Sequence, residues 1–259
     1  MRLAIIVGCG RSGTNWLAKI LAESEACTVT REDKPLFNLV VDIVVRGQRD
    51  RIKTLIPAYR NRAMQYAPSL FVDKSHPALF LVDELAAAFP ASEDGSECGI
   101  QFVGIERNPF ATVASMLLHE GVSGWLEQTV PVPSPFFGIG EGESLEAWRA
   151  KPPHMRHLQR WWAHHVEMAR IKAAYPQAVH VIEYEALVEN HGVELAALDR
   201  FLQGPLGNPN WPALAPAKEI RTDSLDKWER TLTDQQKDDI EGGLVEYARL
   251  APCLLGGND

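Results

Sequence analysis

The chain has 259 residues, of which 46% are hydrophobic and 23% are charged, and its formal net charge at pH 7 is −8. This composition is ordinary for a globular protein, and the length suits one large α/β domain or two small ones. The acidic balance argues against broad electrostatic binding of nucleic acid or of an acidic membrane surface.

The four cysteines, Cys9, Cys27, Cys98 and Cys253, show neither a C-x-x-C pair nor a spacing with histidine. They therefore predict no zinc site and no disulfide framework. No apolar run approaches the roughly 18 residues that cross a membrane, and the chain starts directly on a strand-like segment without a signal peptide. A cytoplasmic protein without a membrane partner is expected.

The first informative stretch is residues 3–21. Five apolar residues from Leu3 to Val7 indicate a buried strand, three glycines allow a tight turn, and apolar residues recur at helical spacing after Thr14. Such a turn binds phosphate because backbone N–H groups and the positive end of the helix face one point, where the hydroxyls of Ser12 and Thr14 add donors. An ordinary strand-to-helix connection is the alternative interpretation.

The same loop differs from two common nucleotide loops. It lacks the G-x-x-x-x-G-K-[ST] pattern of nucleoside-triphosphate loops because Thr14 stands where lysine is required. Its cation, Arg11, lies inside the turn instead. It also departs from the dinucleotide pattern, because the polar pair Thr14-Asn15 follows Gly13 and no acidic residue closes a second strand at the expected distance.

A short β-rich run at residues 26–30 is followed by Glu32. A carboxylate just past a strand end, at the edge where the first loop lies, is placed to face a ligand, although a solvated turn would also explain it. Residues 36–66 are predicted to be helical. Their Arg and Lys side chains indicate a solvated face or the border of a pocket for an acidic acceptor.

A second strand is predicted to end in Asp73-Lys74-Ser75-His76, with a helix from about 78 to 89 after it. In extended backbone Lys74 and His76 point to the same side. A lysine and a histidine beside an arginine-bearing anion loop suit the transfer of a negatively charged group. The alternatives are an ion pair between Lys74 and Asp73, and a helix-capping role for His76.

The next predicted strand, residues 100–105, leads to Arg107 and a helix from 110 to 118. Arg107 closes the strand and Ser115 lies two turns into the helix, so that both can reach one oxyanion. The alternative is a helix start with a buried pair of arginine and glutamate. Residues 119–155 are rich in Gly and Pro and are predicted to be an irregular loop, either a mobile cover on the acceptor side or a passive insertion.

The rest of the chain is predicted to form a helix at 157–175, a strand at 178–182 and helices at 193–202 and 233–250. The neighbours His164 and His165 point about 100° apart on a helix, which favours core packing over a shared metal. The alternation of strands and helices predicts a three-layer α/β/α fold with a central, mainly parallel sheet. The cations Arg11, Lys74 and Arg107 should then share one crevice at the strand ends.

Four motifs resemble sulfotransferases that use 3′-phosphoadenosine 5′-phosphosulfate (PAPS). The run Arg-Ser-Gly-Thr-x-Trp-Leu resembles the 5′-phosphosulfate loop, with Gly10 in place of the usual Pro and Asn15 in place of a hydroxyl residue. Lys74-Ser75-His76 resembles the family's Lys-Thr-His element. Arg107-Asn108-Pro109 with Ser115 is similar to the 3′-phosphate motif, and Tyr184-Glu185-Ala186-Leu187 to a late element near the nucleotide. The resemblance covers roughly residues 3–118 and 178–240.

The resemblance implies a P-loop NTPase-like sulfotransferase fold, with one domain over residues 1–259 and an acceptor-side insertion at about 119–155. It implies PAPS as co-substrate, 3′-phosphoadenosine 5′-phosphate (PAP) as product, and no metal. Catalysis would fall to Arg11, Glu32, Lys74 and His76. The nucleotide-binding residues would be Gly10, Arg11, Ser12, Gly13, Thr14, Asn15, Trp16, Arg107, Ser115, Tyr184, Arg221 and Lys227. Trp16 would stack on adenine, and Arg221 and Lys227 would close over the 3′-phosphate.

Two questions stay open at this point. The general base is His76, as in cytosolic members, or Glu32, which holds the place of the base in bacterial members, with His76 favoured for a hydroxyl acceptor. The function is sulfuryl transfer to a hydroxyl or amine of a small or glycan-like acceptor. A non-catalytic PAP-binding protein and an NTP-dependent kinase are the alternatives. A homodimer is compatible with either function.

Overall fold

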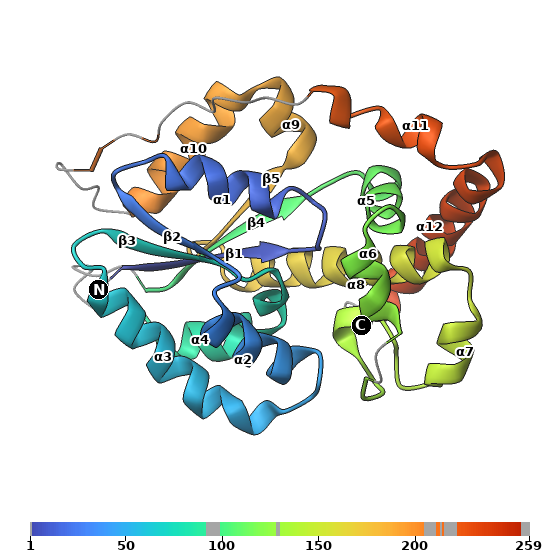
Figure 1. Ribbon diagram of the computed structural model, residues 1–259, viewed down its shortest axis with the longest axis horizontal. Helices are drawn as coiled ribbons and strands as arrows, with labels where there is room; N and C mark the ends of the chain where they lie inside the picture. The colour runs from blue at the N-terminus through green and yellow to red at the C-terminus, as the bar shows by residue number, and fades with distance from the viewer. Residues whose placement is uncertain are drawn as a thin grey trace.

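A computed structural model describes residues 2–91, 99–127, 130–204, 211–212, 214 and 222–254. Its centre is a sheet of five parallel strands in the order β2-β3-β1-β4-β5 (Figure 1). The strands are β1 (Leu3–Gly8), β2 (Cys27–Arg31), β3 (Leu70–Lys74), β4 (Gln101–Glu106) and β5 (Val179–Glu183). Because every strand is parallel, all carboxyl ends lie at one edge of the sheet.

Strand β1 is buried on both faces, as expected for a central strand in a parallel sheet. Successive side chains of a strand point to opposite faces, so Ile5 and Val7 pack into one hydrophobic cluster and Ala4 and Ile6 into another. All four side chains are fully buried. The glycine loop, defined here as residues 8–14, leaves the carboxyl end of this strand and is therefore held by the best-packed part of the fold.

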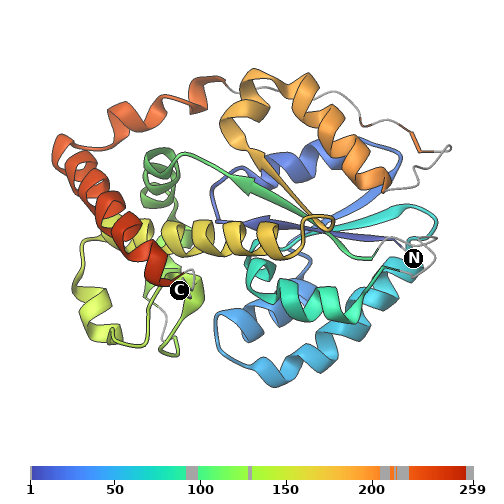
Figure 2. The same cartoon turned by 180° about the vertical axis from the view of Figure 1, so that it is seen from behind.

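Helices cover both faces of the sheet (Figures 1 and 2). One face carries α1 (Thr14–Ala22), α9 (Tyr184–Glu189) and α10 (His191–Gln203), and the other carries α2 (Lys34–Val44), α3 (Ile52–Gln65), α4 (Val82–Ala88) and α8 (Pro153–Ala174). This arrangement confirms the predicted three-layer α/β/α fold. Toward the carboxyl edge lie α5 (Pro109–Leu117), α6 (Glu120–Leu126), α7 (Leu145–Ala150), α11 (Lys227–Thr231) and α12 (Asp234–Leu254). Short 3₁₀ turns complete the fold: η1 (Arg49–Arg51), η2 (His76–Leu81), η3 (Pro135–Phe137) and η4 (Thr222–Ser224).

The predicted helical region 36–66 is divided into α2 and α3, with η1 between them. Gly47 explains the break, because its φ of +71° is a left-handed conformation that ends a helix. A Cβ at this position would lie 3.0 Å from the Pro131 side chain, so the chain also needs the small residue there.

Residues 119–155 contain more regular structure than their Gly and Pro content predicts. They form α6, η3 and α7, and the side chains of Phe136, Phe137 and Trp148 are at most 1% exposed. These rings join the cluster on the α8 face of the sheet. The segment thus forms part of the core beside the carboxyl edge. In the described part of the chain, no helix is both long and apolar enough for a membrane crossing.

Candidate active site

The glycine loop makes a tight left-handed turn into α1. Gly13 has a φ of +101°, and a Cβ at that position would lie 2.5 Å from the ring of Tyr184. Arg11 adopts a φ of +75°, which is uncommon for a residue with a side chain and costs on the order of 1–3 kcal/mol. The turn therefore holds a strained cation at the start of a helix, which is typical of a ligand-binding loop.

Donors suited to an anion gather in this loop. The first turn of a helix leaves backbone N–H groups without an acceptor at its positive end. In α1, which begins at Thr14, the Trp16 N–H donates to the Gly13 carbonyl oxygen at 2.9 Å. Thr14 is the first residue of α1 and is buried. The buried Ser12 Oγ has no hydrogen-bond partner among the described residues. Burial raises the pKa of the Cys9 thiol to about 12, so this side chain stays neutral and does not repel an anion.

Two arginines meet beside the loop. The Arg11 Nε donates to Ser115 Oγ at 3.2 Å, and the Arg107 Nη1 donates to the Arg11 carbonyl oxygen at 3.3 Å. Burial lowers the pKa of both guanidinium groups, and the charge of Arg107 lowers that of Arg11 further. Arg11, Arg107 and Ser115 are brought together as the sequence predicts, but Arg11 turns toward Ser115 rather than toward Lys74.

Tyr184 and the late segment enclose Arg107. The Arg107 guanidinium carbon lies 4.4 Å above the Tyr184 ring, and its Nη2 donates to the Ser224 carbonyl oxygen at 2.6 Å. The Tyr184 hydroxyl and Ser224 Oγ are 2.6 Å apart. Trp16 packs edge-on against Tyr184, with 5.5 Å between ring centres. These contacts join Arg107 after β4, Trp16 on α1, Tyr184 on α9 and Ser224 on η4 into one wall at the carboxyl edge.

A second cluster forms where β2 and β3 end. Glu32 follows β2, and its carboxylate accepts a hydrogen bond from the Lys74 ammonium at the end of β3. His76 Nδ1 lies 3.5 Å from the same carboxylate oxygen. The Lys74 side chain is 2% exposed and the Glu32 side chain 40%. Glu32 adopts a φ of +54°. Among the described residues, Arg11 and Glu32 are the two non-glycine residues with a positive φ.

The side chains of this second cluster differ in charge at neutral pH. The contact with His76 and the charge of Lys74 lower the pKa of Glu32 to about 2, so it is a carboxylate at neutral pH. Burial lowers the pKa of His76 to about 4, which leaves a neutral imidazole. Burial also lowers the pKa of Lys74, although Glu32 opposes that effect. The charge of Arg11 reaches Lys74, so the two clusters share one electrostatic field.

Neither alternative interpretation of Lys74 and His76, at the end of β3, holds. Asp73 accepts hydrogen bonds from Thr30 at 2.7 Å and Tyr59 at 2.8 Å, and Lys74 pairs with Glu32 instead. His76 makes no side-chain cap at the start of η2. The side chains of Lys74 and His76 both reach Glu32, in agreement with the prediction that they point to one side.

Three predicted binding residues remain outside these clusters. Asn15 and Lys227 are exposed to solvent, at the start of α1 and of α11. Arg221 lies outside the described residues.

His164 and His165 have separate partners, the Arg160 carbonyl oxygen at 2.8 Å and the Glu106 carboxylate at 2.7 Å. Nowhere in the described ranges do three metal-binding side chains gather.

Arg160, a buried arginine next to the glycine loop, is not among the residues predicted from the sequence. It lies on α8 and is 1% exposed, with its guanidinium carbon 4.3 Å from the centre of the Phe136 ring. A Cβ on Gly10 would lie 3.1 Å from Arg160 Nη2 and 3.4 Å from His76 Nε2. The signal in the sequence is Gly10 itself, because its missing side chain leaves space next to Arg160 and His76.

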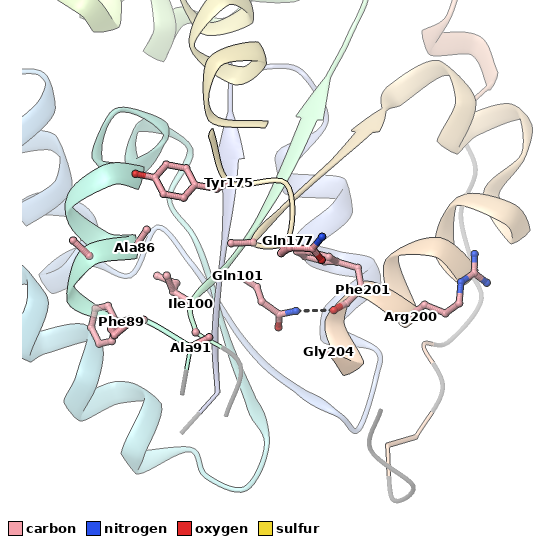
Figure 3. Close-up of a pocket in the computed structure, with 14 residues that line it drawn as sticks. Ala86, Phe89, Ala91, Ile100, Gln101, Tyr175, Gln177, Arg200, Phe201 and Gly204 are labelled. Atoms are coloured by element: carbon pink, nitrogen blue, oxygen red, sulfur yellow. Dashed lines mark hydrogen bonds between the residues drawn. The ribbon is translucent and has the colours of Figure 1, made fainter. Parts of the chain in front are cut away.

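A cavity lies at the opposite edge of the sheet. Its volume is about 620 Å³, and its lining includes Phe89, Gln101, Tyr175 and Phe201 (Figure 3). Gln101 opens β4 and donates to the Phe201 carbonyl oxygen at 2.6 Å. None of the residues predicted to form the site lines this cavity.

An open parallel sheet with a glycine loop and cations at its carboxyl edge defines an α/β protein whose ligand site is expected at that edge. The family is shown by sequence: the model of the sulfotransferase family matches residues 4–207, and the chain belongs to this family. A comparison with curated proteins gives no significant match.

Solved structures share the fold. The sulfotransferase domain of the curacin biosynthetic pathway is 15% identical with a TM-score of 0.55, covering 94% of this chain and 97% of its own. The sulfotransferase domain of the Synechococcus PCC 7002 olefin synthase is 14% identical with a TM-score of 0.55, covering 95% and 94%. Mouse sulfotransferase SULT7A1, solved with PAP, is 15% identical with a TM-score of 0.51, covering 99% and 89%.

Proposed function

We propose that the protein transfers the sulfuryl group of PAPS to a hydroxyl or amine of a small or glycan-like acceptor and releases PAP. One observation carries this proposal: the cations Arg11 and Arg107 on one side, and the buried Lys74 with Glu32 and His76 on the other, flank one glycine loop at the same edge of the sheet. PAPS carries phosphate at two separate positions, and cations on both sides of the loop match that distribution of charge. The PAP complex of a protein with the same fold is in keeping with this choice.

In this proposal the nucleotide spans both clusters. The backbone of residues 10–15 and the Ser12 and Thr14 hydroxyls bind the 5′-phosphate, since they surround the N-terminus of α1. Arg107 and Ser115 bind the 3′-phosphate. Trp16 and Tyr184 flank the adenine, whose flat ring suits their aromatic wall. Arg221 and Lys227 remain predictions for closing the 3′-phosphate side.

The reaction is a direct displacement at sulfur. The acceptor oxygen or nitrogen forms a bond to sulfur while the bond from sulfur to the bridging oxygen breaks, and the electron pair stays on the 5′-phosphate of PAP. The acceptor proton goes to the base. Lys74 stabilises the charge that develops on the bridging oxygen. Its ammonium group acts strongly there because it is buried and little water screens its charge. This scheme requires no metal.

The geometry favours His76 as the base. It is neutral and its conjugate acid has a pKa of about 4, whereas Glu32 has a pKa of about 2 and already accepts from Lys74. The stronger base of the two is therefore the imidazole. Its Nδ1 faces Glu32 at 3.5 Å, and its Nε2 lies toward Gly10. A carboxylate facing one ring nitrogen orients the imidazole so that the other nitrogen can accept a proton.

Aromatic side chains around His76 indicate the acceptor side. Phe37 on α2 and Trp125 on α6 each have a ring centre 6.1 Å from that of His76, and both are partly exposed. Phe136 closes the buried side at 6.2 Å. An acceptor with an apolar or aromatic body next to its hydroxyl fits this wall.

The test is turnover of PAPS with a panel of hydroxyl and amine compounds that have apolar, aromatic or sugar bodies. We expect PAP to form at a rate that depends on the acceptor. Binding of PAP without any PAP formation across the panel would instead support a non-catalytic nucleotide-binding protein. Binding of ATP in preference to PAP would support a kinase.

The compartment, the partners and the oligomeric state of the protein are proposals as well. Cys9 and Cys27 are free thiols in the described part of the chain, in keeping with a reducing cytoplasm. Apart from PAPS and the acceptor, no nucleic-acid or membrane partner is proposed. A homodimer remains a prediction that the molecular mass in solution would test.

A further inference from the structure

Arg160 is a buried charge without a matching carboxylate. Its side chain is 1% exposed, and in the described ranges Nε and Nη1 have no hydrogen-bond partner and no carboxylate lies within 4.0 Å. Burying an unpaired charge costs free energy, and proteins normally pair or neutralise such a group. The rings of Phe136, Phe137 and Trp125 around it offset only part of that cost. The fold therefore maintains a cation at this place at the expense of stability.

The position of Arg160 points to the site. Its Nη2 lies above Gly10 of the glycine loop, on the same side as His76 Nε2. Its charge lowers the pKa of both His76 and His164. Arg160 thus belongs to the electrostatic surroundings of the proposed base, although it comes from α8 rather than from a strand end.

The glycine loop leaves room for a second cation there. Arg11, the cation of the loop, turns away to Ser115 beside Arg107. On the acceptor side lies Gly10, whose missing side chain gives Arg160 its space. Gly10, which stands where the family usually has proline, therefore leaves the space that Arg160 occupies.

We propose that Arg160 is a further catalytic residue, which binds the oxygens of the sulfuryl group beside the glycine loop and His76. This inference rests on the proposed function. A guanidinium presents several N–H donors in one plane and suits a tetrahedral anion with several oxygens. Arg160 would hold the sulfuryl group through the transfer from PAPS to the acceptor, while Lys74 stabilises the bridging oxygen.

The test compares PAPS with PAP, because the two ligands differ only in the sulfuryl group. In Arg160→Met we expect the affinity for PAPS to fall at least tenfold and that for PAP to change less than twofold, both measured by calorimetry without acceptor. Arg160→Lys keeps the charge but not the planar donors and should recover part of the PAPS affinity. The thermal midpoint of Arg160→Met should stay equal to the wild type or rise, since an unpaired buried charge is removed.

Arg156 provides the matched control one turn earlier on α8. It is also buried and stacks on an aromatic ring, Trp148, but it has a carboxylate 3.6 Å away on Glu127. Arg156→Met should leave both affinities unchanged.

Several outcomes would overturn the proposal. An unchanged ratio of PAPS to PAP affinity in Arg160→Met, with lower stability, would assign Arg160 to packing alone and leave the proposed function intact. If Arg160→Met does not fold, Arg160→Lys decides: a PAPS affinity equal to the wild type's, at unchanged stability, would show that planar donors are not used. A wild-type protein that binds neither PAP nor PAPS would refute the proposed function itself, and this inference with it.

Discussion

The Lys74 ammonium donates a hydrogen bond to the Glu32 carboxylate and so joins the ends of neighbouring strands β3 and β2. Their side chains are 42 residues apart in sequence, and the backbone supports the pair, since the Glu32 N–H donates to the Lys74 carbonyl oxygen at 3.1 Å. Lys74 is almost fully buried, whereas Glu32 is partly exposed. The carboxylate therefore keeps a buried cation charged at the proposed transfer site.

Removing the charge of Glu32 should destabilise the fold. Glu32→Gln leaves the Lys74 charge buried without its partner, so we expect the free energy of unfolding at pH 7 to fall by about 1–3 kcal/mol, as measured by urea denaturation. The double variant Glu32→Gln, Lys74→Met should recover most of that loss. Glu84→Gln is the control, because Glu84 pairs with the exposed Arg49 and its loss should change stability by less than about 0.5 kcal/mol. Equal effects of the two Glu→Gln changes would contradict a coupled pair.

The two candidate bases can be separated by turnover. If His76 is the base, His76→Ala should lower kcat by roughly 10²–10⁴-fold, the usual contribution of general base catalysis. Glu32→Gln should lower it less, because this change disturbs only the orientation of the imidazole and the partner of Lys74. Steady-state kinetics with one fixed acceptor measures both variants. The reverse order of effects would assign the base to Glu32.

Stability should fall as the pH drops below neutral. Burial lowers the pKa of His76 to about 4 and of His157 to about 3, against about 6.5 in the unfolded chain. Between these values the unfolded chain binds the protons, so stability is complete above pH 6.5 and is lost as the pH falls toward the folded pKa values. From pH 7 to pH 5 each histidine should remove about 2 kcal/mol.

His157→Leu tests this directly, since the residue lies on α8 and has no role in the proposed reaction. Unfolding free energies at pH 7 and pH 5 should differ by about 2 kcal/mol less in the variant than in the wild type. Identical pH dependence of the two proteins would mean that His157 takes up its proton as readily in the folded state.

Gly10 should tolerate no side chain. Gly10→Ala places a Cβ 3.1 Å from Arg160 Nη2 and 3.4 Å from His76 Nε2, so those groups must move. We expect a loss of about 1–3 kcal/mol in stability, together with lower turnover. Gly142→Ala is the matched control, because no atom lies within 4 Å of the added methyl group. Wild-type turnover of Gly10→Ala would contradict the close packing of Arg160 and His76 over the loop.

The sequence predicted the sheet edge well. Glu32, Lys74 and Arg107 could be placed at one edge because each lies at or just after the end of a strand, and parallel strands end at one edge. Lys74 and His76 do reach the same side, but strand geometry is not the reason, because β3 ends at Lys74 and His76 opens η2. In contrast, the direction of Arg11 depends on its left-handed φ, which local residue types did not reveal.

Contacts between distant segments account for what the sequence did not predict. Helical spacing treats an arginine as solvent-exposed, yet Arg160 is buried under Phe136, which lies 24 residues earlier in a region predicted to be irregular. That region folds because Phe136, Phe137 and Trp148 complete the core beside α8. The small residue at position 47 likewise suits a contact far along the chain, because a Cβ there would lie 3.0 Å from Pro131.

The most direct test of the central claim is calorimetric titration of the purified protein with PAP, AMP and ATP. PAP should bind at least tenfold more tightly than AMP, because only PAP carries the 3′-phosphate proposed to contact Arg107 and Ser115. Ser115→Ala should reduce this preference by about tenfold, the value of one hydrogen bond to a charged group, and leave AMP binding unchanged. A folded protein that binds AMP or ATP as tightly as PAP, or that binds no PAP, would contradict the account.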